Sequence, residues 1–384
     1  MSIKLVDKGS NQAFEVIEEE STFRTLWTSP DKTGSDYTSI DLNELEQFKE
    51  KIVVIDSVYS GSGRDQQKNI YSQVINPVFN KLSIRHEYIK TENVNSVRNY
   101  AKSLKPVGST TVLFLSGDTT VSEFVNGLQE TECTECADCM SNLTLLALPH
   151  GTGNSLALSL GYESKLDAFK RLFTGTHIPL NLYKAELPSG SCILRNEVRS
   201  EVETRVYFIV VLSWAFHAAI VADSDTAELR KLGSERFKVA AMKNLESQQS
   251  YEGSTYIDNE KVEGPFCYWL VTGAKRFEPT FDISPKGNIE DASLYLVAIG
   301  AEHGSKLLEI MYEVYDKGKH TEDNRVLYRK IDKGQNVELD VGATSKKRLC
   351  LDGSIIALPD DKESKIGIES IGNEKGCWRI YACR

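Results

Sequence analysis

The sequence is short of positive charge and of cysteine. Its 45 lysine and arginine residues face 55 aspartate and glutamate residues, which gives a formal net charge of −10. A chain of this charge has no overall attraction to nucleic acid or to an anionic membrane surface, so we expect no nucleic-acid partner. Eight cysteines in 384 residues do not make a disulfide framework, and the first residues lead into polar sequence without the apolar segment of a secretory signal. We therefore expect a cytoplasmic protein.

The sequence also lacks a convincing membrane span. The uncharged run Val206–Ala222 is barely long enough to cross a bilayer, and it contains Ser213, Trp214 and His217. We predict instead that this run forms a buried pair of strands, or a strand followed by a helix.

Three of the cysteines, Cys133, Cys136 and Cys139, have a C-x2-C-x2-C spacing that could hold a metal ion or part of an iron–sulfur cluster. A fourth ligand at a helpful spacing is missing, and no histidine follows nearby. We therefore favour a polar surface loop between two apolar strands and keep metal binding as the alternative.

Hydrophobic residues make up 40% of the chain and charged residues 26%, which are ordinary values for a globular protein. At roughly 100–200 residues per domain, the length predicts two domains. We divide the chain into an N-terminal extension without an assigned role, residues 1–48, a first domain, residues 49–180, and a second domain, residues 181–384.

In the first domain, short apolar segments alternate with helical patterns. The expected strands are 52–56, 84–89, 111–115 and 143–148, and the expected helices are 66–82, 94–104, 121–128 and 155–160. This alternation predicts a doubly wound α/β domain with a mostly parallel sheet.

In the second domain, segments that resemble strands dominate. They are 182–187, 191–198, 204–212, 267–272, 294–299, 324–330, 336–341 and 347–351, with helical patterns at 225–232, 237–246 and 305–314. A run of strands after an α/β half predicts a separate, strand-rich domain.

Three glycine-rich turns follow predicted parallel strands. They are Ser60-Gly61-Ser62-Gly63, Ser116-Gly117-Asp118-Thr119-Thr120 and Gly151-Thr152-Gly153-Asn154. Glycine lets the backbone approach an anion, and ligands of doubly wound sheets lie beyond the carboxyl ends of the strands. Three such turns at strand ends of one sheet predict a phosphate-rich ligand.

Asp118 stands out in these turns because a carboxylate opposes phosphate binding unless it has another task. It could bind Mg²⁺ or accept a proton from an attacking hydroxyl, and the alternative is an aspartate that only forms the turn. Thr120 and Glu123 have the spacing of a capping box, which predicts that the next helix begins after Thr120.

Two motifs in this region resemble a known family. The segment Phe-Leu-Ser-Gly-Asp-Thr-Thr-Val-Ser-Glu-Phe-Val-Asn-Gly-Leu, 114–128, is similar to the Gly/Ser-Gly-Asp-Gly…Glu-Val-Val-Asn-Gly-Leu motif of the diacylglycerol kinase catalytic domain superfamily. The segment Leu-Pro-His-Gly-Thr-Gly-Asn-Ser-Leu-Ala, 148–157, resembles its Leu-Pro-x-Gly-Thr/Ser-Gly-Asn-x-Leu-Ala motif. NAD kinases share a Gly-Gly-Asp-Gly turn but not the second motif.

The second half resembles the sphingosine (long-chain base) kinase branch of this superfamily. The similar segments are Trp214-Ala215-Phe216, Ala222-Asp223-Ser224-Asp225, Arg230-Lys231-Leu232-Gly233-Ser234-Glu235-Arg236-Phe237, Lys317-Gly318-Lys319-His320 and Asp352-Gly353. The resemblance covers about residues 50–360.

The resemblance implies ATP as donor, Mg²⁺ as cofactor and a lipid alcohol as acceptor, in a cleft between a nucleotide-binding domain and a β-sandwich that holds lipid. Asp118 would be the general base and a Mg²⁺ ligand, and Asp223 would meet the polar head of the lipid. Nucleotide contacts would come from Ser60, Gly61, Gly63, Thr91, Ser116, Gly117, Thr119, Gly151, Thr152, Gly153, Asn154, Arg230, Arg236 and Asp352. A lipid acceptor also implies transient peripheral contact with a membrane.

Departures from the family pattern leave an alternative open. Thr119 replaces a glycine, where a Cβ would crowd the phosphates or forbid a turn with positive φ. Ser354 replaces the glutamate of Asp-Gly-Glu, and Asp56-Ser57-Val58-Tyr59 precedes the first glycine-rich turn in place of the family's Asn-Pro. The stretch from Trp214 to Asp223 is also longer than in the sphingosine branch. The alternative to a lipid kinase is thus a pseudokinase that binds nucleotide or lipid in a regulatory role, and a kinase of a non-lipid alcohol is a third, minor interpretation.

Overall fold

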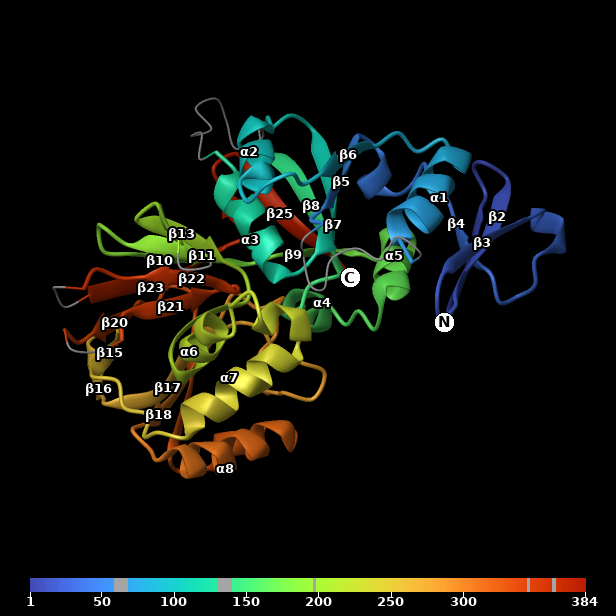
Figure 1. The fold of residues 1–384 in the computed structure, drawn as a ribbon. Coiled ribbons are helices and arrows are strands. Elements are labelled where there is room, and N and C mark those ends of the chain that lie inside the picture. The colour runs from blue at the N-terminus through green and yellow to red at the C-terminus, as the bar shows by residue number, and fades with distance from the viewer. Residues whose placement is uncertain (59–67, 130–139, 196–197, 344–345, 361–363) are drawn as a thin grey trace. The chain divides into compact units, whose positions relative to one another are not determined.

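The computed structural model describes residues 1–58, 68–129, 140–195, 198–343, 346–360 and 364–384. They belong to two units (Figure 1). The first unit comprises Met1–Gly151, Leu160–Pro179 and Lys375–Arg384, and the second comprises Thr152–Ser159 and Leu180–Glu374. Whereas the sequence-based boundary assigned all residues after 180 to the second domain, the structure assigns Lys375–Arg384 to the first unit.

Residues 1–48 form a sheet of their own within the first unit. Its strands, in the order β3-β2-β1-β4, are Phe23–Thr28, Gln12–Glu18, Ser2–Asp7 and Thr38–Ile40, and short 3₁₀ turns lie at Pro30–Lys32 and Glu46–Phe48. The Phe14 ring is fully buried and packs against Trp27 and against Phe173 of helix α5 (Lys165–Thr174). The extension is therefore part of the core of the first unit.

The main sheet of the first unit is mostly parallel. Its strands, in the order β24-β25-β8-β7-β5-β6, are Glu374–Lys375, Trp378–Cys383, Ser141–Pro149, Ser109–Ser116, Lys51–Asp56 and Glu87–Lys90, and β9 (His177–Pro179) pairs with β25. The pairs from β25 through β8, β7 and β5 to β6 are all parallel. The C-terminal strand β25, red in Figure 1, thus lies beside β8.

Short helices connect the parallel strands. They are η3 (Tyr71–Ile75, a π-helix), α1 (Asn76–Lys81), α2 (Ser96–Ser103) and α3 (Asp118–Gly127). A Cβ atom on Gly127 would lie 2.7 Å from the carbonyl oxygen of Arg98, so the close packing of α2 on α3 requires glycine there.

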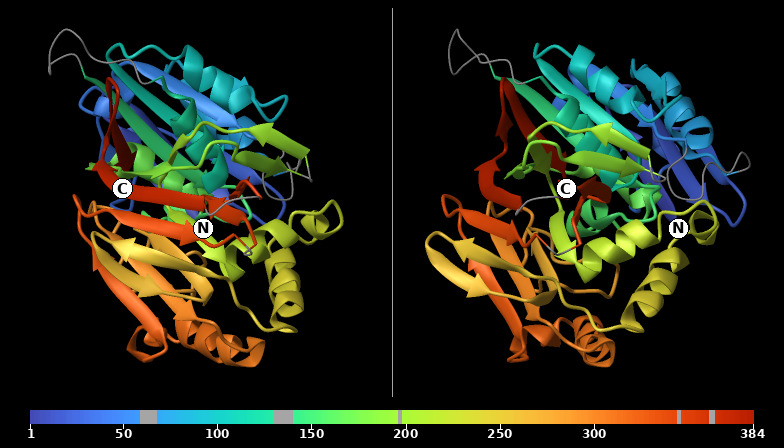
Figure 2. Two further views of the ribbon diagram at one scale, coloured as in Figure 1. Left: turned by 90° about the vertical axis from the view of Figure 1, so that its left-hand side faces the viewer. Right: turned by 60° about the vertical axis from the view of Figure 1, so that its left-hand side comes forward.

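The second unit contains two antiparallel sheets that pack face to face. The six-stranded sheet, in the order β13-β10-β23-β20-β15-β16, consists of Arg205–Phe208, Leu182–Glu186, Ser364–Gly372, Val337–Val341, Gly253–Ile257 and Glu260–Glu263. The eight-stranded sheet, in the order β12-β11-β22-β21-β14-β17-β18-β19, consists of Val198–Glu201, Cys192–Arg195, Ser354–Ala357, Arg348–Leu351, Val211–Ala215, Phe266–Thr272, Leu294–Gly300 and Val326–Ile331. One core cluster contains residues of both sheets, among them Leu339, Ile366, Trp214 and Trp269, so the unit is a β-sandwich (Figure 2).

The eight-stranded sheet also carries helices. Helix α6 (Phe216–Asp223) packs on β14, β17 and β21, and α7 (Glu235–Leu245) packs on α6 and α8 (Gly304–Tyr315). Shorter helical segments are α4 (Ser155–Ser159), η5 (Leu229–Leu232) and η6 (Lys319–Glu322). None of the helices in the described parts of the chain is both long and apolar enough to cross a bilayer.

Candidate functional site

The two family-like motifs meet at the carboxyl edge of the parallel sheet. Ser116, the last residue of β7, lies directly beside Pro149, the last residue of β8, and the backbone nitrogen of His150 donates to the carbonyl oxygen of Ser116 at 3.0 Å. Neighbouring strands of a sheet lie only about 5 Å apart. The register therefore brings Gly117 and Gly151, which follow these two strands, to the same edge.

Asp118 is the first residue of helix α3, and the extended Gly117 (φ −106°) precedes it. Its carboxylate thus belongs to the first helical turn, where the partial positive charge of the helix favours a negative group. The capping-box prediction for Thr120 is wrong, because the helix begins at Asp118, three residues earlier than a cap at Thr120 requires. Thr119 has helical backbone angles, so this position does not need the positive φ for which only glycine is suited.

Thr91 lies at the same edge, directly after β6, and its side chain is buried. Its backbone nitrogen donates to the carbonyl oxygen of Asp56 at 3.0 Å, and its hydroxyl accepts a hydrogen bond from the nitrogen of Val58 at 3.2 Å. Thr91 thereby fixes the backbone that leads into the first glycine-rich turn. The predicted contacts Ser60, Gly61 and Gly63 lie outside the described residues, as do Cys133, Cys136 and Cys139.

The second motif continues from Gly151 in the first unit to Thr152, Gly153 and Asn154 in the second. The carbonyl oxygen of Asn154 accepts a hydrogen bond from the backbone nitrogen of Leu158 at 3.0 Å, in the first turn of helix α4. A Cβ atom on Gly153 would meet no atom of the described residues within 4 Å, and its φ is not positive. Packing against the described parts of the chain therefore does not explain this glycine, whereas the close approach of a ligand to the backbone would.

Arg230 of η5 and Arg236 of α7 are brought together by Asp225. The Asp225 carboxylate accepts a hydrogen bond from Arg230 Nε at 2.6 Å and lies 3.8 Å from the nearest nitrogen of Arg236. Burial lowers the pKa of Arg236, and Asp225 opposes this shift. The sequence contained Asp225 within a motif but did not indicate that it contacts both arginines. Because one carboxylate faces two guanidinium groups, the cluster keeps one net positive charge.

Asp223 lies at the end of helix α6 with both carboxylate oxygens engaged. Arg348 of β21 donates to Oδ1 at 2.7 Å, and the amide of Asn244 donates to Oδ2 at 3.0 Å. Burial alone would raise the pKa of Asp223, but the hydrogen bonds from Arg348 and Asn244 outweigh it and hold the pKa below its usual value. The carboxylate is therefore ionised at neutral pH, and neither Arg348 nor Asn244 was found from the sequence.

Asp352 occupies the two-residue turn between β21 and β22, with φ at +47°. Its side chain is 2% exposed, and its carboxylate accepts hydrogen bonds from the backbone nitrogens of Ile209, Val210 and Val211 at 2.7–2.9 Å. This geometry favours a structural role for Asp352, which the sequence analysis had predicted to contact nucleotide.

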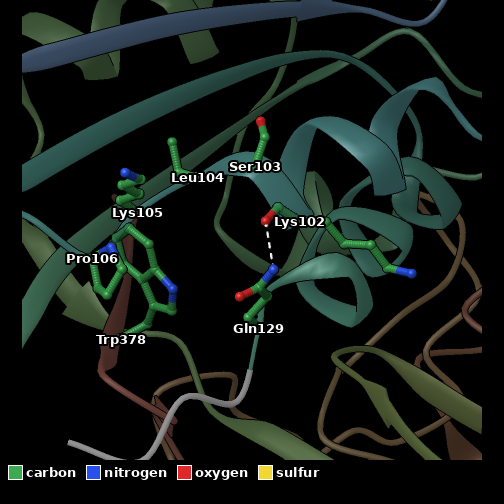
Figure 3. A pocket seen from close by; sticks show the side chains of 7 residues that line it. All are labelled: Lys102, Ser103, Leu104, Lys105, Pro106, Gln129 and Trp378. Atoms are coloured by element: carbon green, nitrogen blue, oxygen red, sulfur yellow. Dashed lines mark hydrogen bonds between the residues drawn. The ribbon is translucent and has the colours of Figure 1, made fainter.

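A pocket of about 390 Å³ lies at the opposite edge of the parallel sheet, where β7 and β25 begin. Figure 3 shows its lining residues, Lys102, Ser103, Leu104, Lys105, Pro106, Gln129 and Trp378. Because ligands of parallel sheets bind beyond the carboxyl ends of the strands, this pocket is separate from the candidate site.

The described residues contain no group of three or more His, Cys, Asp or Glu side chains that could hold a metal ion. A resident metal centre of the structural kind is thus not present in this part of the chain. Mg²⁺ that enters with a nucleotide usually takes one or two carboxylates and the phosphate oxygens, and the single carboxylate of Asp118 suits that arrangement.

Comparison with known proteins confirms the resemblance seen in the motifs. Residues 51–185 match the model of the family described as "Diacylglycerol kinase catalytic domain". Sphingosine kinase 1 of Mus musculus is 27% identical over 213 residues, which cover 53% of this chain and 50% of that protein. Sphingosine kinase 1 of Rattus norvegicus is 23% identical over 303 residues, which cover 67% of this chain and 74% of that protein. Both relatives are sphingosine kinases, and the match spans about half the length of the mouse protein.

The fold is also similar to a solved structure. A putative diacylglycerol kinase from Bacillus anthracis str. Sterne superposes with a TM-score of 0.57 at 17% identity, and the match covers 87% of this chain and 97% of that one. At this identity the likeness concerns the fold alone.

Proposed function

We propose that this chain is an ATP-dependent lipid kinase that phosphorylates a hydroxyl group of a sphingoid base or a related lipid such as diacylglycerol or ceramide. The observation that carries the proposal is the register of β7 and β8, in which Ser116, two residues before Asp118, lies beside Pro149, two residues before Gly151. A carboxylate beside glycine-rich backbone suits phosphoryl transfer, which mainly needs positioning and charge neutralisation.

In this proposal, Asp118 accepts the proton of the lipid hydroxyl. The hydroxyl oxygen then forms a bond to the γ-phosphorus while the bond to the bridging oxygen of ADP breaks, so the products are a phosphorylated lipid and ADP. Backbone groups of Ser116, Gly117, Gly151 and Thr152–Asn154 cradle the phosphates, and Thr119 supplies a hydroxyl. Thr91 acts through the backbone that it holds at the start of the first glycine-rich turn. Mg²⁺ bound with ATP would supply further neutralisation of the phosphate charge.

The arginine pair is the proposed cationic contact of the second unit. Because one Asp225 carboxylate serves both guanidinium groups, Arg230 and Arg236 retain donors for phosphate oxygens. Asp223, ionised and oriented by Arg348, is proposed to meet the polar head of the lipid.

A lipid acceptor also requires transient contact with a membrane, and we assign it to the exposed face of α7. Val239 and Met242 are 45% and 52% exposed on this face, and the exposed Lys238 and Lys243 flank them. Apolar side chains between lysines suit the surface of an anionic bilayer. Met242→Glu should reduce sedimentation with phosphatidylserine vesicles, and unchanged binding would argue against this face.

The test of the function is transfer of radiolabel from γ-labelled ATP to a panel of sphingoid bases, diacylglycerols, ceramides and non-lipid alcohols in mixed micelles with Mg²⁺. We expect transfer to at least one lipid, and a loss of roughly 10²–10⁴-fold in Asp118→Asn because a positioned base is removed. The variant should keep its ATP affinity. A folded, ATP-binding wild type that is inert on the whole panel would refute the proposal.

The second candidate function, a pseudokinase, draws on Thr119 and Ser354. If Thr119 crowds the phosphates, Thr119→Gly should raise kcat, and if its hydroxyl contacts a phosphate, the same change should raise KM for ATP. A pseudokinase predicts instead an inactive wild type that gains transfer when Thr119→Gly is combined with Ser354→Glu.

A further inference from the structure

The face of the eight-stranded sheet beneath helix α6 carries an unusual set of polar side chains. Ser213 of β14 lies opposite Leu270 of β17 and Cys350 of β21, so these side chains share one face of the sheet. Tyr268, two residues before Leu270, points to the same face. Trp214 and Trp269 belong to the other face, in the sandwich core.

Helix α6 adds a histidine to this set. The chain turns sharply at Ala215 (φ +59°), and α6 begins at the next residue. His217 thereby folds back over the strand that precedes it, and its Nδ1 lies 2.6 Å from Ser213 Oγ. The His217 ring is 6.1 Å from the ring of Tyr268 and 5.4 Å from that of Phe277.

The hydroxyl of Tyr268 is the anomaly in this cluster. The residue is 1% exposed, and its Oη has no hydrogen-bond partner among the residues that the structure describes. Buried hydroxyl groups are nearly always paired, because an unpaired one loses its hydration without compensation. A ligand group that forms a hydrogen bond with this hydroxyl would remove this cost.

All members of the cluster are uncharged at neutral pH. Burial lowers the pKa of His217 to about 4 and raises that of Cys350 to about 12, and it also raises the pKa of Tyr268. An ammonium or phosphate group would lose its hydration here without a counter-charge, whereas a neutral group would not.

We propose that Tyr268, His217 and Ser213 form a buried polar subsite that binds a hydroxyl on the hydrocarbon chain of the lipid, additional to the phosphorylated one and, in a sphingoid base, to the one at C3. The inference rests on the proposed function, because it assigns the specificity of the same enzyme. A hydroxyl both donates and accepts, which matches the Tyr268 hydroxyl on one side and the Nε2 atom of the neutral imidazole on the other. A lipid that lacks this hydroxyl leaves both groups unpaired and binds less well.

The experiment compares two pairs of lipids that differ only in additional hydroxyls: sphinganine against 4-hydroxysphinganine, and dioleoylglycerol against diricinoleoylglycerol. We measure kcat/KM and equilibrium binding of the radiolabelled lipids for the wild type, for Tyr268→Phe and for the control Tyr312→Phe. Tyr312 is 66% exposed on α8 and belongs to no proposed site. The wild type and the control should prefer the hydroxylated member of at least one pair by about tenfold or more.

Tyr268→Phe should reduce this preference to nearly one, whereas a merely structural defect would lower kcat/KM for both members of a pair alike and leave the preference unchanged. The subsite would be overturned if the wild type showed the same kcat/KM and affinity for both members of each pair, or if the preference persisted in Tyr268→Phe. If no lipid is phosphorylated, the proposed function fails. The equilibrium binding of the lipids to the wild type and to Tyr268→Phe then still shows whether the subsite exists.

Discussion

Removal of the Asp352 side chain should strongly destabilise the second unit. Asp352→Ala takes the acceptor from three backbone N–H groups, those of Ile209, Val210 and Val211, all in residues that are at most 6% exposed. An unsatisfied buried donor costs about 1–3 kcal/mol, so three give roughly 3–9 kcal/mol. The positive φ of Asp352, which alanine tolerates less well than aspartate, acts in the same direction.

Asp352→Asn should lie between the wild type and Asp352→Ala. The amide oxygen can keep the two bonds that Oδ1 accepts from Val210 and Val211, whereas the amide nitrogen would face the N–H of Ile209. One lost acceptor predicts a cost of about 1–3 kcal/mol. Because the carboxylate is engaged within the fold, ATP affinity should stay unchanged in this variant.

The assay is urea unfolding followed by the fluorescence of Trp214 and Trp269, combined with hydrogen exchange of a peptide that covers residues 205–215. Asp316→Asn, which removes an exposed carboxylate paired with Lys319, is the control and should leave the unfolding midpoint where it is. If Asp352→Ala unfolds at the same urea concentration as this control, with unchanged exchange at residues 209–211, the three buried donors do not depend on Asp352 and the prediction is wrong.

Three further predictions test other contacts. Arg230→Ala and Arg236→Ala should each weaken ATP binding by about tenfold or more, since each removes a charge-assisted contact, and the control Lys231→Ala should not weaken it. Unchanged ATP affinity in both arginine variants would reject the assignment of these arginines. The pKa of His217 is depressed to about 4 in the folded protein, so its contribution to stability is complete above about pH 6.5 and is lost as the pH falls from there towards 4. Urea midpoints at pH 7 and pH 5 should therefore differ less in His217→Gln than in the wild type, and an equal difference would contradict the assignment. Phe14→Ala should cost the first unit about 3–5 kcal/mol because it opens a cavity against Trp27 and Phe173; a wild-type unfolding curve would show that residues 1–48 are not part of its core.

The parallel strands of the first unit were predictable from short stretches of sequence. The apolar runs at 52–56, 111–115 and 143–148 lie within β5, β7 and β8, whose residues are buried on both faces of the sheet. Such runs can be recognised without knowing which strands they pair with, because any parallel strand covered on both sides has this composition. Since glycine-rich turns follow each of them, the edge that carries Asp118 was predictable as well.

The segment 204–212 is an example of a structure that local sequence patterns did not predict. It was predicted as one strand, but β13 and β14 belong to different sheets, and the chain passes between them at Ile209 and Val210. The residue that holds this crossing, Asp352, is more than 140 positions away in the sequence. No signal within 204–212 reveals it, because the change of sheet depends on a hydrogen-bond acceptor supplied by another hairpin.

The same reason explains what else the sequence left open. Strand β25 pairs with β8, so Trp378 lies beside Ser141, and the sheet of residues 1–40 is fixed by Phe14 against Phe173. The sequence by itself determined which segments are apolar, which turns admit phosphate and which carboxylate stands among them, since neighbours along the chain set these properties. Only the tertiary structure decided that Arg348 pairs with Asp223, that Asp225 contacts two arginines and that Tyr268 has no hydrogen-bond partner within the described parts of the chain. Each of these depends on which distant segments the folded chain brings into contact.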